Sequence, residues 1–179
     1  MKSIKILIAT LLISNIALAQ TYLATDEGSK VHFTIKNFGI KTGGDFTGLK
    51  GTILFNPKTL ASSSINVSVD AKTVNTDNGS RDKHLRKEEY FNVEKFPLLT
   101  FVSTKITESS TTGRFFVIGN LTIKGVTKSI QFGFSATPSA SGYLFAGDFE
   151  INRRDFGIGG SSSVMADKLK VSLNVFAKK

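Results

Sequence analysis

Hydrophobic and polar residues alternate with a period of two over most of the chain. The clearest run extends from Ile65 to Lys72, where Ile, Val, Val and Ala alternate with Asn, Ser, Asp and Lys. Such alternation is typical of a strand with one buried and one exposed face. The same pattern predicts strands at residues 31–36, 49–55, 65–72, 98–104, 114–124, 129–135, 143–151 and 168–175. About eight strands are enough for a closed barrel that holds one small ligand.

Turn-forming residues separate these runs at 56–57, 110–113, 125 and 139–142. Short turns of this kind join neighbouring antiparallel strands. Several runs extend to about ten residues, or roughly 30 Å at 3.3 Å per residue. The sequence therefore predicts an all-β fold, an elongated antiparallel eight-stranded barrel, as one domain over residues 20–179.

One connection, within residues 69–101, is much longer than a hairpin needs and is densely charged. Asp77, Asn78 or Ser80 can cap a helix that starts near Arg81. We therefore predict one short helix near residues 81–90, which contacts the barrel through Leu85 and covers an opening.

Cationic side chains in and beyond this connection have two open interpretations. Arg81, His84 and Arg153 can bind the carbonyl or phosphate head group of a ligand at the barrel mouth. Alternatively, Arg81 with Asp82, and Arg153 or Arg154 with Asp155, form structural ion pairs, since arginine suits both uses.

The N-terminus has the pattern of a cleaved signal peptide. Lys2 and Lys5 precede an apolar run, and Ala17-Leu18-Ala19 provides a small-x-small cleavage site. The run is shorter than the roughly 20 apolar residues of a membrane anchor. Residues 1–19 are therefore predicted to be removed, which places the mature protein in the periplasm or outside the cell. With no cysteine in the chain, no disulfide supports the fold.

The composition is basic, with a formal charge of +9. Loss of Lys2 and Lys5 with the signal peptide leaves +7, from 21 basic and 14 acidic residues. Export and the lack of an aromatic-basic string argue against nucleic acid as a partner. The simplest interpretation is a set of solvated lysines, with weak attraction to anionic membrane surfaces as an additional role.

The predicted inward face carries many of the 15 phenylalanines, and the chain has no tryptophan. Phenylalanine provides apolar area without a polar group that needs a partner. Such an interior suits an alkyl or prenyl chain. The same rings can instead fill the core, and periodicity alone does not distinguish a lined tunnel from a packed interior.

Catalysis and metal binding have little support in the sequence. The chain has two histidines, no cysteine and no Gly-x-Ser-x-Gly motif. Asp82 and His84 are two residues apart and do not share a helix face. We expect neither enzymatic activity nor a metal or cofactor.

Several fragments, in order, resemble the YceI-like polyisoprenoid-binding family. They are Val31-His32-Phe33, Gly44-Asp45-Phe46, Arg81-Asp82-Lys83-His84-Leu85, Tyr90-Phe91-Asn92-Val93 with Phe96-Pro97, Gly119-Asn120-Leu121-Thr122-Ile123 and Asn152-Arg153-Arg154-Asp155-Phe156-Gly157. The resemblance implies an exported bacterial protein whose elongated, lipocalin-like barrel encloses a long isoprenoid chain. The stretch before the first long strand, Asp26 to Phe33, departs from the family pattern, so His32 is left out of the predicted site.

The predicted function is to bind, carry or store an isoprenoid quinone or polyprenyl lipid. The predicted tunnel residues are Phe33, Ile35, Phe46, Val67, Val69, Leu85, Phe91, Phe101, Phe132, Phe134, Phe149, Ile151 and Phe156, and the predicted head-group residues are Arg81, His84 and Arg153. The alternative is a ligand-free structural or stress-response barrel with a filled core. The sequence leaves the oligomeric state open, a homodimer included.

Overall fold

The computed structural model describes residues 19–179, so the predicted signal peptide lies outside the described residues except for Ala19. Its strands are β1 (Gln20–Asn37), β2 (Ile40–Phe46), β3 (Lys50–Phe55), β4 (Ser64–Asp70), β5 (Leu98–Glu108), β6 (Arg114–Ile123), β7 (Val126–Ser139), β8 (Gly142–Asn152) and β9 (Met165–Lys178). One α-helix, α1 (Gly79–Leu85), and three short 3-10 helices, η1 (Leu60–Ser62), η2 (Ala71–Thr73) and η3 (Arg153–Phe156), complete the described fold.

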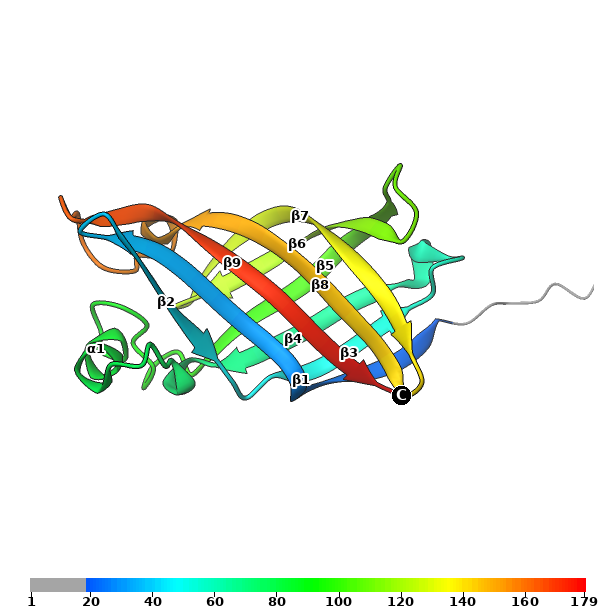
Figure 1. Ribbon diagram of the computed structural model, residues 1–179, viewed down its shortest axis with the longest axis horizontal. Helices are drawn as coiled ribbons and strands as arrows, with labels where there is room; N and C mark the ends of the chain where they lie inside the picture. Colours follow the sequence, from blue (N-terminus) through cyan, green and yellow to red (C-terminus); the bar gives the residue numbers. More distant parts are fainter. Residues whose placement is uncertain (1–18) are drawn as a thin grey trace, which may run out of the picture.

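Eight antiparallel strands close into the barrel that the alternation predicted. β1 pairs with β3 through its first residues and with β9 along most of its length, and β3 to β9 pair in sequence order. The ninth strand, β2, pairs with the second half of β1. β2 and β3 therefore lie one after the other along β1, and Figure 1 shows the resulting long barrel of tilted strands.

The break between β2 and β3 is held by side chains from neighbouring segments. Asp26 accepts hydrogen bonds from the backbone N–H groups of Gly48 (2.9 Å) and Leu49 (2.8 Å). Asp26 itself lies in an irregular part of β1, where the register with β9 shifts between Thr25 and Lys30. These contacts satisfy backbone donors that no strand partner reaches.

The long connection after β4 forms α1 at one end of the barrel. Asn78 caps the helix by accepting from the N–H of Arg81 (3.0 Å). The helix is shorter than predicted, because the chain turns after Leu85 and the N–H of Phe91 bonds to the Leu85 carbonyl (3.0 Å). The connection lies very close to β2, where a Cβ on Gly44 would be 2.7 Å from the carbonyl oxygen of Asn75.

The two ends of the barrel differ (Figure 1). α1 lies at one end, whereas Gln20 and the C-terminus lie at the other. At this second end the interior is filled by aromatic rings, since Phe55 contacts Phe115 and Phe145 at centroid distances of 5.3 Å each and Tyr143 at 5.4 Å. Phe55 is 2% exposed. This half of the barrel, the packed half, has an ordinary close-packed core.

Candidate functional site

A cavity of about 210 Å³ extends from the end of the barrel near α1 to Phe134 and Phe145, at the border of the packed half. Four of the phenylalanines around it, Phe33, Phe101, Phe132 and Phe149, are only partly buried although they point into the barrel. In the packed half, by contrast, Phe115 is 5% exposed and Val117 is fully buried. The same pattern of inward apolar residues therefore fills one half of the barrel and lines an empty space in the other.

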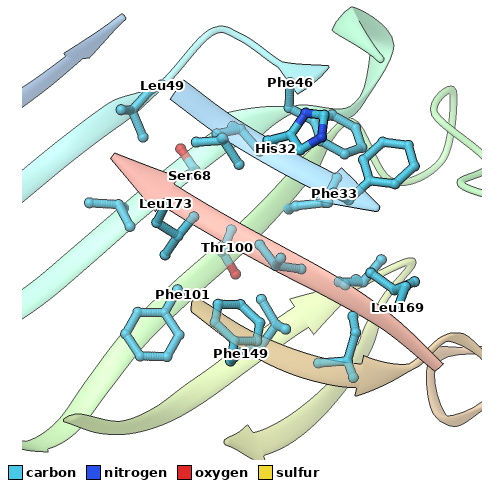
Figure 2. A pocket seen from close by; sticks show the side chains of 18 of the residues that line it. His32, Phe33, Phe46, Leu49, Ser68, Thr100, Phe101, Phe149, Leu169 and Leu173 are labelled. Atoms are coloured by element: carbon cyan, nitrogen blue, oxygen red, sulfur yellow. The ribbon is translucent and has the colours of Figure 1, made fainter. Parts of the chain in front are cut away.

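The cavity wall is built from both sides of the barrel. Figure 2 shows Phe33 and Phe46, from β1 and β2, on one side and Phe101 and Phe149, from β5 and β8, on the other. Phe132 stacks on Phe149 at a centroid distance of 4.7 Å and lies 5.6 Å from Phe101. These rings form a continuous apolar wall.

Two glycines lie at inward positions of the barrel, and one of them, Gly147, is in the cavity wall. A Cβ on Gly119 would lie 2.4 Å from the Phe101 ring, so the absence of a side chain makes room for that ring. Gly147 lies between Phe145 and Phe149 on β8 and lines the cavity. A glycine inside a strand weakens it and often marks close approach of another group.

The segment that follows α1 covers the end of the cavity. Tyr90 and Phe91 reach the lining from this segment, as does Leu85, the last residue of α1. Phe91 contacts Phe46 edge-on at 5.4 Å, and Phe46 contacts Phe33 at 5.7 Å. This ring series forms the mouth of the cavity.

A lysine joins the segment that follows α1 to the loop after η3. The ammonium of Lys124 donates to the carbonyls of Gly157 (2.7 Å) and Glu89 (3.2 Å). The N–H of Gly159 also donates to the Glu89 carbonyl (2.9 Å). These contacts hold two loops together beside the cavity.

Twelve of the thirteen predicted tunnel residues lie in the cavity wall. They are Phe33, Ile35, Phe46, Val67, Val69, Leu85, Phe91, Phe101, Phe132, Phe134, Phe149 and Ile151. Phe156 is 2% exposed in η3 and does not contribute to the wall. The structure thus brings the predicted set together with one exception.

Among the predicted head-group residues, only Arg153 reaches the cavity wall, and its guanidinium is engaged elsewhere. It donates to the carbonyls of Ile158 (2.8 Å), Gly160 (2.9 Å) and Ala166 (3.0 Å) and to the Asp167 carboxylate (2.7 Å). Arg153 is 1% exposed. Of the two open interpretations, the contacts of Arg153 match the structural ion pair, but its partner is Asp167 and not Asp155, and the arginine anchors the loop before β9.

Arg81 and His84 lie outside the cavity wall. Arg81 donates to the hydroxyl (2.8 Å) and carbonyl (2.7 Å) of Thr76. Asp82 accepts from the N–H (2.9 Å) and hydroxyl (2.5 Å) of the same threonine, so both residues hold Thr76 and do not pair with each other. The His84 ring lies 4.9 Å from the Tyr90 ring.

Several cavity residues were not in the predicted site. The largest group is on β9, where Leu169, Val171, Leu173 and Val175 line the wall. The regular alternation of these residues identified the inward face of β9 correctly, and this was the signal that could have found them. His32, which was left out of the predicted site, also lies at the wall, and its Nδ1 is 2.7 Å from Asp45 Oδ1 across the β1–β2 pair.

The chemistry of the site is mainly apolar. Among residues 19–179, no three His, Asp or Glu side chains gather as a metal site would require. The pKa of Tyr22 is raised by burial and then by the nearby Tyr143, and the pKa of Glu27 is lowered by its hydrogen bond to Lys178. Neither residue lines the cavity. Within the same range, no helix is long and apolar enough to cross a membrane.

Comparison with known families identifies the class of protein. The model of the YceI-like domain matches residues 22–177, and the chain belongs to this family. A UPF0312 protein of Yersinia enterocolitica is 32% identical over 168 residues, which cover 89% of this chain and 86% of that protein.

Solved structures share the fold. BcnA of Burkholderia cenocepacia has a TM-score of 0.79 at 23% identity, over 84% of this chain and 96% of that chain. A YCEI protein of Campylobacter jejuni gives 0.68 at 24% identity, over 99% and 93%. A polyisoprenoid binding domain from Saccharophagus degradans, implicated in plant cell wall breakdown, also gives 0.68, at 20% identity over 90% and 98%.

Proposed function

We propose that the barrel binds the chain of an isoprenoid lipid, a quinone or a polyprenyl compound, in the half near α1, and carries or stores it. One observation supports this most strongly. Inward phenylalanines are closely packed in one half of the barrel and surround a cavity of about 210 Å³ in the other. A core that served stability alone would gain from filling this space.

The length of the cavity favours a long chain. Its wall follows β9 from Met165 to Val175. At about 3.3 Å per residue and a strand tilt of about 40°, this stretch covers about 25 Å along the barrel axis. The lining residues are thus spread over a length that suits an extended chain.

Burial provides the affinity. An isoprene unit has five carbons, and burying each is worth about 0.8 kcal/mol, so each enclosed unit contributes about 4 kcal/mol. Three units give about 12 kcal/mol, against an association cost of about 4–15 kcal/mol. Few polar groups line the wall, so the chain, more than the head group, should determine affinity.

The family supports the same conclusion at a coarser level. The related domain from Saccharophagus degradans is a polyisoprenoid binding domain. The proposal includes export, with residues 1–19 removed and the mature chain in the periplasm or outside the cell. It assigns no catalytic step and no cofactor to the protein.

The test uses prenyl alcohols of increasing length, with straight-chain alcohols of equal carbon number as controls. Thermal unfolding of the mature chain is followed as each alcohol is added, since a ligand that binds only the folded state raises the melting temperature. The proposal expects the shift to grow with each isoprene unit until the cavity is full, and to be smaller for the straight chains. Shifts that are absent, or independent of length, would favour a ligand-free barrel.

A further inference from the structure

The tip of the β1–β2 hairpin carries exposed apolar residues. Phe38 and Ile40 are 72% and 69% exposed, the highest values among the large hydrophobic residues of positions 19–179. The N–H of Phe38 donates to the carbonyl of Val164 (2.8 Å), and Val164 is 40% exposed. We call Phe38, Ile40 and Val164 the apolar tip.

The sequence of this turn is unusual for its backbone conformation. Asn37 pairs with Ile40, so Phe38 and Gly39 form a two-residue loop, with φ values of 51° and 74°. Turns with positive φ at both positions favour Asn or Asp followed by Gly, and a bulky side chain there is strained. The Phe38 ring gains little packing within the fold to offset this strain, which is typical of a residue kept for contact with a partner.

Unpaired lysines surround the apolar tip. Lys36 and Lys41 lie directly opposite each other on β1 and β2, an arrangement that destabilises a strand pair. Both are exposed, as is Lys168 near the start of β9. Among the described residues, none of these three forms an ion pair, whereas Lys30, Lys72, Lys170 and Lys178 each do.

The apolar tip lies at the end of the cavity. The cavity wall includes Ile35, three residues before Phe38, and Met165, which follows Val164. Figure 1 shows the β1–β2 turn and the start of β9 at the same end of the barrel as α1. Apolar surface therefore extends from the cavity to the outside at this end.

The geometry points to a docking surface for an anionic lipid bilayer, with the apolar tip inserted and Lys36, Lys41 and Lys168 on the head groups. A second copy of this chain fits less well, because a symmetric contact would bring two sets of lysines together. An anionic bilayer neutralises them. The purpose of docking, exchange of a prenyl lipid between membrane and cavity, rests on the proposed function; the docking itself does not.

The experiment measures co-sedimentation of the mature chain with vesicles of phosphatidylcholine, with or without an equal share of phosphatidylglycerol. The test variant combines Phe38→Asn, which suits the positive φ, with Ile40→Ser. Its control combines Phe116→Ser with Leu23→Ser, which remove apolar residues that are 41% and 56% exposed near the packed half. A charge variant, Lys36→Gln with Lys41→Gln, is matched by Lys58→Gln with Lys105→Gln, both exposed near the packed half.

Docking predicts sedimentation with the anionic vesicles and much less with the neutral ones. Removing each apolar residue should weaken partitioning about tenfold, and removing each lysine about fivefold, while the two controls sediment like the wild type. Equal sedimentation of the tip variant and the wild type would overturn the proposal. So would self-association that depends on the tip, measured by analytical ultracentrifugation, without vesicle binding.

A second measurement separates this proposal from the proposed function. The tip variant should still bind a soluble short prenyl alcohol, since its cavity is unchanged. If the wild type docks but binds no prenyl alcohol, docking stands and the proposed ligand is wrong. If the wild type binds the alcohol but does not dock, the proposed ligand stands and the docking surface is wrong.

Discussion

Replacing Val171 with Phe distinguishes an empty cavity from a packed core. Val171 is partly buried in the middle of the cavity wall, opposite Phe33 and Phe149 on the two neighbouring strands. Phenylalanine adds four carbons, worth up to about 3 kcal/mol if they enter empty apolar space. After loss of side-chain freedom of up to about 1 kcal/mol, we expect a net gain of about 1–2 kcal/mol in the free energy of unfolding.

The matched control is the same substitution in the packed half. Val117 is fully buried between Ile106 and Phe132 on the adjacent strands and is not in the cavity wall. Val117→Phe should therefore overpack the core and cost about 1–3 kcal/mol. At about 2–4 °C per kcal/mol for a domain of this size, the two variants should shift the melting temperature in opposite directions.

Ligand binding provides the second readout of Val171→Phe. A ring in the middle of the passage should exclude at least one isoprene unit, worth about 4 kcal/mol, or close to a thousandfold in affinity. The assay combines thermal unfolding of the free protein with titration of a prenyl alcohol. If both valine variants are destabilised, the claim that Val171 faces empty space is wrong. If Val171→Phe stabilises the protein but leaves the ligand affinity unchanged, the prenyl chain binds somewhere other than beside Val171.

Three other substitutions test particular contacts. Arg153→Ala leaves three carbonyls and Asp167 without their donor, so urea denaturation should show a loss of about 3 kcal/mol; intact stability with altered head-group preference would show instead that Arg153 binds ligand. Tyr22→Phe should reduce the loss of stability above pH ~10, because burial raises the pKa of folded Tyr22 and its contribution disappears as pH rises through that pKa; identical alkaline profiles of variant and wild type would contradict this. Lys124→Gln removes the bonds to Glu89 and Gly157 and should speed release of a bound prenyl alcohol while costing about 1 kcal/mol of stability; an unchanged release rate would show that these loops do not control the mouth.

The alternation of hydrophobic and polar residues predicted the barrel well, because it can be read from residues that are neighbours in the sequence. It failed where the chain departs from regular pairing. β2, with the sequence IKTGGDF, lacks the alternation of large apolar residues, and the first half of β1 is interrupted by the irregular segment around Asp26. These segments are fixed by tertiary contacts, such as the bonds from Gly48 and Leu49 to Asp26.

The candidate site was only partly accessible from sequence. Inward parity identified most of the cavity wall, yet Phe132 and Phe134 have the same parity and differ in surroundings. Both reach the cavity wall, but Phe134 also packs on Phe55 and Phe115 of the packed half and is 3% exposed, whereas Phe132 is only partly buried. Which rings meet across a barrel depends on strand stagger, which periodicity does not reveal.

The predicted head-group residues were the least predictable part of the site. An arginine that binds ligand and one that anchors a loop look alike in sequence. The partners of Arg153 are backbone carbonyls of Ile158, Gly160 and Ala166, and those of Arg81 belong to Thr76. Backbone acceptors leave no residue-type signal, so the structure was needed to find them.

The most direct test of a prenyl-filled barrel is mass spectrometry of organic extracts from the folded protein, purified from its native source without detergent. The valine variant Val171→Phe, prepared in the same way, serves as the control for lipid that adheres to the surface. The account predicts a prenyl lipid in near-equal amount to the wild-type protein and strongly depleted in the variant. Extracts without lipid, or with straight acyl chains retained equally by both proteins, would contradict it.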